Sequence, residues 1–242
     1  MSPASPLIVC DGLRVGYGGQ PLLPAISLSL EPGQFWAVIG RNGAGKSTFF
    51  KTLLGLLPAV GGTCSRPDSS VPIAYVPQRY AFDPMTPVTA RDVVAMGLLR
   101  GWSFLRPSGD AARVAQALEE VEATALADQL FRSLSEGQKQ RVLLGRVLAS
   151  GARLVLLDEP TAAMDAVAQK EAMARLDALR RRHGLCVVMV SHHLPIAFRY
   201  ADRMLFLDPD ADAVLVGEPD HIKHLPAFHE RYGAAAAEVC GG

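Results

Sequence analysis

The chain has 242 residues, 49% of them hydrophobic, and its 24 lysines and arginines are balanced by 24 aspartates and glutamates. This length can bury one large core, or one domain with a subdomain. The balanced charge argues against the basic surface of a nucleic-acid binder and against a polybasic membrane anchor, so we expect no nucleic-acid partner.

Targeting signals and disulfides are not indicated either. The first residues lack the positive and apolar regions of a signal peptide, and every apolar run is interrupted before it reaches the ~20 residues of a membrane span. We therefore expect the chain to stay in the cytoplasm. The cysteines are far apart in sequence and form no Cys-x-x-Cys motif, which predicts reduced, mostly buried thiols rather than a disulfide framework or a zinc site. They are Cys10, Cys64, Cys186 and Cys240.

Short apolar runs typical of buried strands alternate with segments of helical spacing along most of the chain. The apolar runs are 7–9, 35–39, 73–76, 154–157, 185–190 and 203–207, and the helical segments are 46–57, 109–126, 136–149 and 166–182. Such an alternation predicts an α/β fold with a mostly parallel sheet covered on both faces.

Three segments depart from this alternation. Residues 13–15 and 26–30 alternate apolar and polar side chains, which predicts a small N-terminal antiparallel β subdomain with one solvated face. Residues 79–149 have helical spacing without a convincing strand, so we expect a helical subdomain inserted between two strands of the main sheet. Residues 1–233 would then form a single domain, and the Ala-rich residues 234–242 a disordered tail.

A glycine-rich segment lies between the apolar run 35–39 and a helical segment. Its sequence is Gly40-Arg41-Asn42-Gly43-Ala44-Gly45-Lys46-Ser47. In this strand, loop and helix context the backbone N–H groups can turn toward phosphate oxygens, and the helix start adds a favourable dipole. Lys46 can reach the β- and γ-phosphates, and the Ser47 hydroxyl can hold Mg²⁺. The segment predicts a P-loop that binds a nucleoside triphosphate.

Two carboxylates, Asp158 and Glu159, follow the apolar run 154–157. A carboxylate in the position of Asp158 approaches Mg²⁺ from the carboxyl edge of a parallel sheet. Glu159, one residue later, can face the γ-phosphate and act as a general base or orient water. The alternative is that the pair only caps the next helix, but the phosphate loop earlier in the chain favours the catalytic interpretation.

A second helix start, at Leu134-Ser135-Glu136-Gly137-Gln138, has two interpretations. Ser135 with Gln138 three residues later fits a capping box, which is purely structural. Alternatively, the Ser135 hydroxyl and the Gly137 N–H contact a γ-phosphate through the same helix-terminus chemistry as the loop. One chain has no obvious use for both anion sites on the same nucleotide.

Taken together, these motifs resemble those of the nucleotide-binding subunits of ATP-binding cassette (ABC) transporters, from residue 7 to about residue 233. Residues 40–48, ending at Thr48, resemble the Walker A motif, and residues 154–159 resemble the Walker B motif. Gln78 resembles the Q-loop glutamine, residues 134–138 the signature motif, and Met164-Asp165 the D-loop. His192 resembles the switch histidine, and Tyr17 resembles the aromatic residue that stacks on adenine. The resemblance implies that ATP and Mg²⁺ are the cofactors and that the chain hydrolyses ATP.

The resemblance also implies roles for two further residues. Gln78 would ligate Mg²⁺ and sense the γ-phosphate, because an amide oxygen suits that hard cation. His192 would hydrogen-bond the γ-phosphate and hold Glu159 and water in place. The expected catalytic residues are thus Lys46, Gln78, Glu159 and His192, the expected Mg²⁺ ligands are Ser47, Gln78 and Asp158, and the expected nucleotide contacts are Tyr17, residues 40–48, Ser135, Gly137, Gln138 and Asp165.

Three residues depart from the family pattern. Glu136 stands where the family has glycine, and its carboxylate near a triphosphate is expected to weaken ATP-driven closure by charge repulsion. His193 replaces an aspartate after the switch histidine, and Met164 replaces a leucine before Asp165. We expect both to be tolerated.

In this family each nucleotide lies between the phosphate loop of one subunit and the signature helix of another. A chain with one copy of each motif completes two such sites by pairing, so we expect a homodimer or a pair with a second ABC subunit. The resemblance further implies integral membrane permease subunits, an extracytoplasmic substrate-binding protein, and a peripheral location on the cytoplasmic face of the membrane.

The transported cargo is predicted from weaker similarities. Residues 75–80, 87–97, 217–219, 226–228 and 232–233 resemble the subgroup that serves zinc and manganese importers. Iron-chelate and cobalamin importers share part of this pattern, so these and other import or export cargoes remain alternatives. A P-loop kinase would not need residues 135–138 or His192, and the single cassette argues against a non-transport ABC ATPase. His221, His224 and His229 have spacings that favour solvated surface residues over a metal site.

Overall fold

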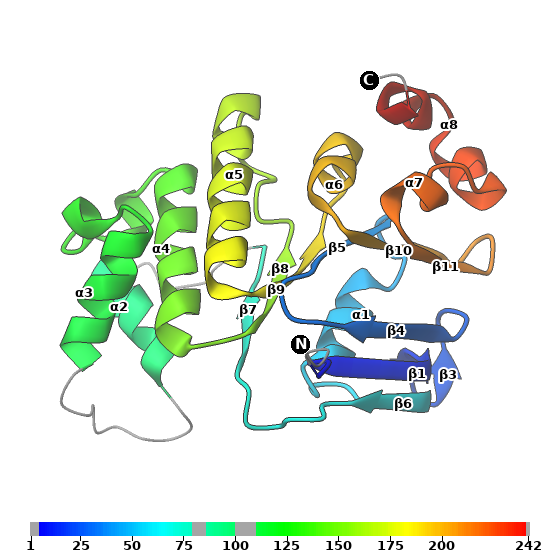
Figure 1. Cartoon of the computed structure of the whole chain (residues 1–242), viewed down its shortest axis with the longest axis horizontal. Coiled ribbons are helices and arrows are strands. Elements are labelled where there is room, and N and C mark those ends of the chain that lie inside the picture. The colour runs from blue at the N-terminus through cyan, green and yellow to red at the C-terminus, as the bar shows by residue number, and fades with distance from the viewer. Residues whose placement is uncertain (1–4, 79–85, 100–109, 241–242) are drawn as a thin grey trace.

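The computed structural model describes residues 5–78, 86–99 and 110–240, with side chains as far as residue 233 (Figure 1). A six-stranded sheet crosses its centre in the order β11-β10-β5-β9-β8-β7. The strands are β5 (Phe35–Gly40), β7 (Ile73–Val76), β8 (Leu154–Asp158), β9 (Cys186–Val190), β10 (Arg203–Asp208) and β11 (Ala213–Gly217). All neighbours are parallel except β10 and β11. The predicted α/β fold with a mostly parallel sheet is confirmed.

Alternate residues of the central strands pack against different layers, as the two-residue period of a strand requires. On one face, Trp36 and Val38 of β5 join a core with Phe49 and Phe50 of α1 (Lys46–Leu53) and with the antiparallel sheet. On the other face, Phe35 packs in a core with the helices between β7 and β9. Both faces of the main sheet are therefore covered.

The antiparallel sheet has the order β4-β1-β6, with β1 (Ile8–Arg14), β4 (Ile26–Leu30) and β6 (Gly61–Ser65). Ile26, Leu28 and Leu30 are buried and alternate with more exposed serines, which confirms the predicted antiparallel part. β6 was not anticipated, because its glycines, threonine and serine carry no apolar pattern. A short hairpin of β2 (Gly16–Tyr17) and β3 (Gln20–Pro21) follows β1.

Helices occupy the described residues between β7 and β8. They are α2 (Ala90–Ala95), α3 (Asp110–Glu120) and α4 (Glu136–Ser150), with 3-10 turns at Met96–Leu98, Thr124–Leu126 and Phe131–Ser133. The three α-helices pack together beside the sheet (Figure 1). Thr89 and Asp92 form a capping box that starts α2. Residues 79–85 and 100–109, which the helical prediction included, lie outside the described residues.

The helices after β8 complete the fold. They are α5 (Ala166–His183), α6 (Leu194–Tyr200), α7 (Pro219–Ile222) and α8 (Pro226–Cys240), of which α5 and α6 lie on the side of the main sheet away from the antiparallel sheet (Figure 1). The backbone of α8 is helical to Cys240, with a non-helical residue at Gly233, although we expected a disordered tail from residue 234. The physical reason is the alanine run, because alanine has the highest helix propensity. Among the described residues, no helix has both the length and the apolar character to cross a membrane.

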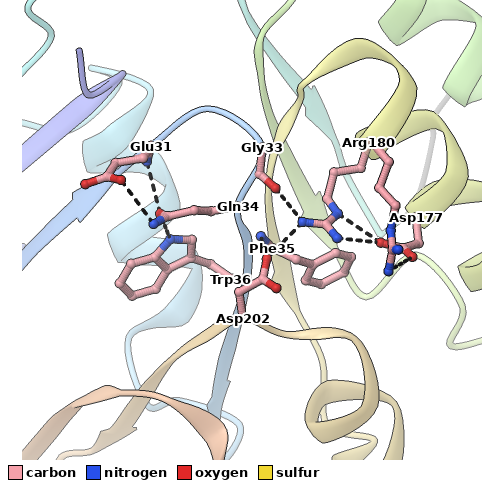
Figure 2. A network of polar contacts seen from close by, with 9 residues as sticks. Glu31, Gly33, Gln34, Phe35, Trp36, Asp177, Arg180 and Asp202 are labelled. Carbon is pink, nitrogen blue, oxygen red and sulfur yellow. Dashed lines mark hydrogen bonds and ion pairs between the residues drawn. The ribbon is translucent and has the colours of Figure 1, made fainter. Parts of the chain in front are cut away.

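A buried arginine ties together three segments at the amino end of β5 (Figure 2). Arg180, near the end of α5, is 7% exposed and pairs with Asp177 on its own helix and with Asp202, whose Oδ2 lies 2.8 Å from its guanidinium. The guanidinium also donates to the Gly33 carbonyl, and Asp202 Oδ2 accepts from the Phe35 N–H at 2.7 Å. The network joins α5, the turn before β5 and the loop before β10.

We expect Asp202→Ala to lower the free energy of unfolding by about 2 kcal/mol, because it removes a partner of a buried guanidinium and leaves the Phe35 N–H without its acceptor. Urea denaturation measures this loss. The matched control is Asp128→Ala, which breaks an exposed ion pair with Arg91 and should cost less than about 1 kcal/mol. Equal losses in both variants would contradict a special role for the Arg180 network.

Candidate functional site

The predicted phosphate loop connects β5 to α1, and two of its glycines are required, one by a close backbone contact and one by its backbone conformation. A Cβ on Gly40 would lie 2.5 Å from the Leu207 carbonyl oxygen of β10. Gly45 precedes α1 with φ of 86° in the left-handed region, and a Cβ there would lie 2.9 Å from Leu23. The loop therefore packs closely against Leu207 and Leu23, and the first turn of α1 follows it immediately.

Lys46 lies under this loop with its side chain held by backbone carbonyls. The residue is 7% exposed, and its Nζ donates to the oxygens of Gly40 at 2.7 Å and Arg41 at 2.8 Å. Burial lowers the pKa of Lys46, while the carboxylates of Glu159 and Asp158 act in the opposite direction. The loop thus contains a positioned, largely desolvated ammonium group.

The aromatic residue predicted to stack on adenine lies on the same side of the fold. Tyr17, in β2, is 50% exposed, and its hydroxyl lies 3.3 Å from Thr48 Oγ1 in the first turn of α1. This hydrogen bond connects the short hairpin to the helix that follows the phosphate loop. The ring is left available to solvent.

Asp158 ends β8 and contacts the neighbouring strand. The Tyr75 hydroxyl of β7 donates to Asp158 Oδ2 at 3.3 Å. Burial raises the pKa of Asp158 above its usual range, the Tyr75 hydrogen bond lowers it, Glu159 raises it and Lys46 lowers it. The sequence indicated Asp158 but not Tyr75, because the contact depends on the pairing of β7 with β8, which leaves no pattern along the chain.

Glu159 is the centre of a polar cluster assembled from three adjacent strands. Gln78 follows β7 and donates through Nε2 to Glu159 Oε2 at 2.8 Å. His192 follows β9, and its Nδ1 lies 3.3 Å from the same oxygen. Glu159 itself has φ of 48°, a left-handed conformation that is uncommon for a non-glycine residue, and its N–H donates to the Val190 carbonyl at 3.0 Å. The backbone and both neighbours fix the direction of this carboxylate.

The second predicted anion site is an intact helix start. Ser135 Oγ accepts from the Gln138 N–H at 3.3 Å, and the Gln138 side chain accepts from the Ser135 N–H at 2.9 Å. Ser135, Gly137, Gln138 and Asp165 line one pocket of about 470 Å³, whose lining includes no residue of the loop 40–48. The predicted capping box is present, and the pocket at this helix start contains no residue of the phosphate loop of the same chain.

The three departures from the family pattern have local explanations. His193 caps α6, because its Nδ1 accepts from the Ile196 N–H at 3.4 Å in the way an aspartate would. Asp165 caps α5 by accepting from Ala168, and Met164 lines the pocket beside it. Glu136 pairs with Lys139, whose Nζ lies 2.7 Å from Glu136 Oε1. The i,i+3 spacing could have predicted this pair.

Sequence reasoning also missed Gln140. This residue of α4 is 5% exposed, and neither of its amide atoms has a hydrogen-bond partner among the described residues. It lines a pocket of about 640 Å³ that Gln78, Glu136 and Glu159 also line. A polar side chain inside an otherwise helical apolar pattern was the signal that could have found it.

The family model described as ABC transporter matches residues 23–162. A zinc import ATP-binding protein ZnuC of Pseudomonas fluorescens is 37% identical over 236 residues, covering 96% of this chain and 85% of the relative. A ZnuC of Yersinia pseudotuberculosis is 35% identical, covering 96% and 87%.

Solved structures show the same fold. A putative metal-chelate type ABC transporter in an inward-facing conformation superposes with a TM-score of 0.81 at 30% identity, covering 90% of this chain and 85% of that one. An ATP-binding cassette of another ABC transporter gives a TM-score of 0.80 at 20% identity, covering 95% and 99%. With the family model matching more than half of its length, this chain belongs to the ABC transporter family and is an ATP-binding, ATP-hydrolysing cassette.

Proposed function

We propose that this cassette drives the import of zinc through membrane permease subunits. We assign zinc as the cargo because 96% of the chain is similar to proteins named as zinc import ATP-binding proteins. These names favour zinc over manganese within the subgroup indicated by the sequence. The cassette would act as a peripheral subunit on the cytoplasmic face of the membrane, together with an extracytoplasmic substrate-binding protein.

The phosphate loop binds the triphosphate of ATP in this proposal. The backbone N–H groups of residues 40–48 surround the phosphates, and Lys46 exchanges its carbonyl partners for phosphate oxygens. Tyr17 stacks on the adenine with its exposed ring. Binding thus converts existing contacts of Lys46 into contacts with the ligand.

The oxygen donors near the loop fit Mg²⁺. They are the Ser47 hydroxyl, the Asp158 carboxylate and the Gln78 amide oxygen, and hard divalent cations prefer such ligands. Since Nε2 of Gln78 donates to Glu159, the amide oxygen is the atom left for a cation. Bound Mg²⁺ would neutralise charge on the β- and γ-phosphates. The ionised form of Asp158, which burial disfavours, would gain a compensating charge.

Glu159 acts as the general base or orients the attacking water. Its side chain is 14% exposed, so most of its surface is already desolvated, whereas that of His192 is 62% exposed. Gln78 and His192 hold the carboxylate from either side. His192 is placed to hydrogen-bond the γ-phosphate and to keep Glu159 and water aligned.

In this proposal, the remaining nucleotide contacts form only when two cassettes pair. Ser135, Gly137, Gln138 and Asp165 line a pocket without the phosphate loop, so a second chain must supply the loop. A two-fold arrangement satisfies both half-sites at once, in a homodimer or with a second ABC subunit. ATP binding would then close the pair and hydrolysis would reopen it.

A metal chelate is the second candidate cargo, because one similar structure is described as a putative metal-chelate type ABC transporter. A gene deletion distinguishes the two cargoes. We expect the deletion strain to fail in chelator-treated medium and to recover when zinc salt, but not manganese salt or an iron chelate, is added. Rescue by another supplement in place of zinc would contradict zinc import.

The same strain tests Glu159. Complementation with Glu159→Gln should fail, although the purified variant still binds ATP and elutes as an ATP-dependent dimer in size-exclusion chromatography. Glu119→Gln, which neutralises an exposed glutamate of α3, is the matched control and should restore growth fully. Wild-type ATP turnover in Glu159→Gln would contradict the assignment of Glu159 as the base or water-orienting group.

Tyr75→Phe should change the pH dependence of ATP hydrolysis. The Tyr75 hydrogen bond lowers the pKa of Asp158, so its loss raises that pKa further. Because Mg²⁺ binds the ionised carboxylate, the acidic limb of the activity profile should move to higher pH while the alkaline limb stays in place. Tyr200→Phe, in the helical core, is the control. An acidic limb that does not move, or moves to lower pH, would count against this role of Asp158.

The Glu136–Lys139 ion pair revises the expected effect of Glu136 on closure. With its charge compensated, Glu136→Gly should alter ATP affinity by less than about twofold, whereas Lys139→Ala should weaken it by about two- to fivefold, the range of an exposed pair. The double variant should recover, because the uncompensated carboxylate is gone. Isothermal titration with ATP measures all three. A large gain in affinity for Glu136→Gly alone would show that the repulsion persists.

A further inference from the structure

Two cysteines that are far apart in sequence lie opposite each other in the antiparallel sheet. The register between β1 and β6 pairs Cys10 with Cys64, and their sulfur atoms are 4.0 Å apart, with the Cys10 thiol donating to Cys64 Sγ. The two thiols are free, as the sequence predicted, but their closeness in space was not expected. The closeness of two cysteines 54 residues apart could not be predicted, because the sequence of β6 has no pattern typical of a strand.

The position of the pair in the sheet favours formation of a covalent bond. Residues directly opposite in an antiparallel pair have Cβ atoms about 4.5–5.5 Å apart, close to the 3.5–4.5 Å of a disulfide. The pairing of β1 with β6 shifts register between Asp11 and Arg14, and the pairing with β4 shifts just after Cys10. Such an irregularity interrupts the ladder, so the two strands can approach locally without moving the rest of the sheet.

The two thiols are chemically unequal. Cys10 is 2% exposed and belongs to the core, whereas Cys64 is half-buried and reachable from solvent. The hydrogen bond from Cys10 lowers the pKa of Cys64 to about 7, against the effect of burial and with a contribution from Arg66. The same pairing, together with burial, raises the pKa of Cys10. Cys64 is thus the thiolate that reacts first, and Cys10 is the buried thiol beside it.

We propose that Cys10 and Cys64 form a reversible disulfide in exchange with a low-molecular-weight disulfide such as oxidised glutathione. The Cys64 thiolate attacks one sulfur of the small disulfide, which forms a mixed disulfide and releases one thiolate. Cys10 then attacks Cys64 Sγ, gives up its proton and releases the second small thiol. The two cysteines are oxidised and one small disulfide is reduced to two thiols. The cytoplasmic face of the membrane, where the proposed function places the cassette, is normally reducing, so the bond would form there only under oxidative stress.

The bond would enclose the chain from residue 10 to residue 64. This loop contains Tyr17, the phosphate loop and all of α1. Closing it restricts the unfolded chain and joins β1 to β6 next to the interrupted ladder. The oxidised chain should therefore resist unfolding of the part of the fold that carries the phosphate loop.

Mass spectrometry of the full chain after treatment with oxidised glutathione at neutral pH tests the proposal. We expect wild type to lose two hydrogens in mass, peptide mapping to join Cys10 to Cys64, and dithiothreitol to reverse the change. In Cys10→Ser the reaction should stop at one glutathione on Cys64, and in Cys64→Ser the Cys10 thiol should stay reduced. Cys10→Ala serves if Cys10→Ser does not fold.

The matched control is Cys186→Ala. Cys186 is fully buried, and burial raises its pKa to about 12, so this variant should form the same bond as wild type. The proposal is overturned by a stable glutathione adduct on Cys64 of wild type, by a disulfide between two chains or to another cysteine, or by a native chain that does not react.

Thermal unfolding tests the consequence for the loop. The oxidised wild-type chain should unfold about 5 to 10 °C higher than the reduced chain, with the gain lost on reduction and absent in Cys64→Ser. An oxidised chain that unfolds at the temperature of the reduced one would overturn the claim that the bond restrains residues 10–64.

Discussion

The parallel alignment of β5, β9, β8 and β7 is the constraint on which the site depends. Parallel neighbours end at the same edge of a sheet, so the segments that follow these strands meet there whatever their separation in sequence. The phosphate loop follows β5, His192 follows β9, Glu159 follows β8 and Gln78 follows β7. A change in strand order would separate groups that now share hydrogen bonds through one carboxylate oxygen.

Charge compensation determines how the side chains at this edge are arranged. A buried ammonium requires oxygen partners, and Lys46 finds them in the carbonyls of its own loop. Asp158 and Glu159 lie close enough to influence the Lys46 pKa, yet their carboxylates accept hydrogen bonds from Tyr75 and Gln78 instead. The positive and negative groups thus have separate hydrogen-bond partners, although Lys46 and Asp158 each influence the pKa of the other.

The sequence predicted those parts of the fold and site whose information is local. The strand, glycine loop and helix at residues 35–53 could be predicted because burial, turning and helix start each leave a residue pattern. Helix ends were less predictable, since α1 stops at Leu53 before Gly55 in the left-handed region, and α3 stops at Glu120 before Glu122 with φ of 54°. β11 had an apolar run that could have been recognised, whereas β6 is a strand only because β1 offers it a partner. Contacts between distant segments, such as Tyr75 with Asp158 or Cys10 with Cys64, depend on register and leave no pattern along the chain.

The two ends of β5 have different mechanical roles. At its amino end, the buried Arg180 and its partner Asp202 make several polar contacts. These contacts join the turn before the strand, the end of α5 and the loop before β10. At its carboxyl end, the strand passes into a loop whose Gly40 and Arg41 carbonyls accept hydrogen bonds from Lys46, and His192, which follows the neighbouring β9, is 62% exposed. Because β5 is fully buried along its length, displacement of the whole strand would disturb both cores. We therefore expect a ligand at the loop to reposition the exposed side chains and the segments that carry them, while the buried strand and the Arg180 network stay in place.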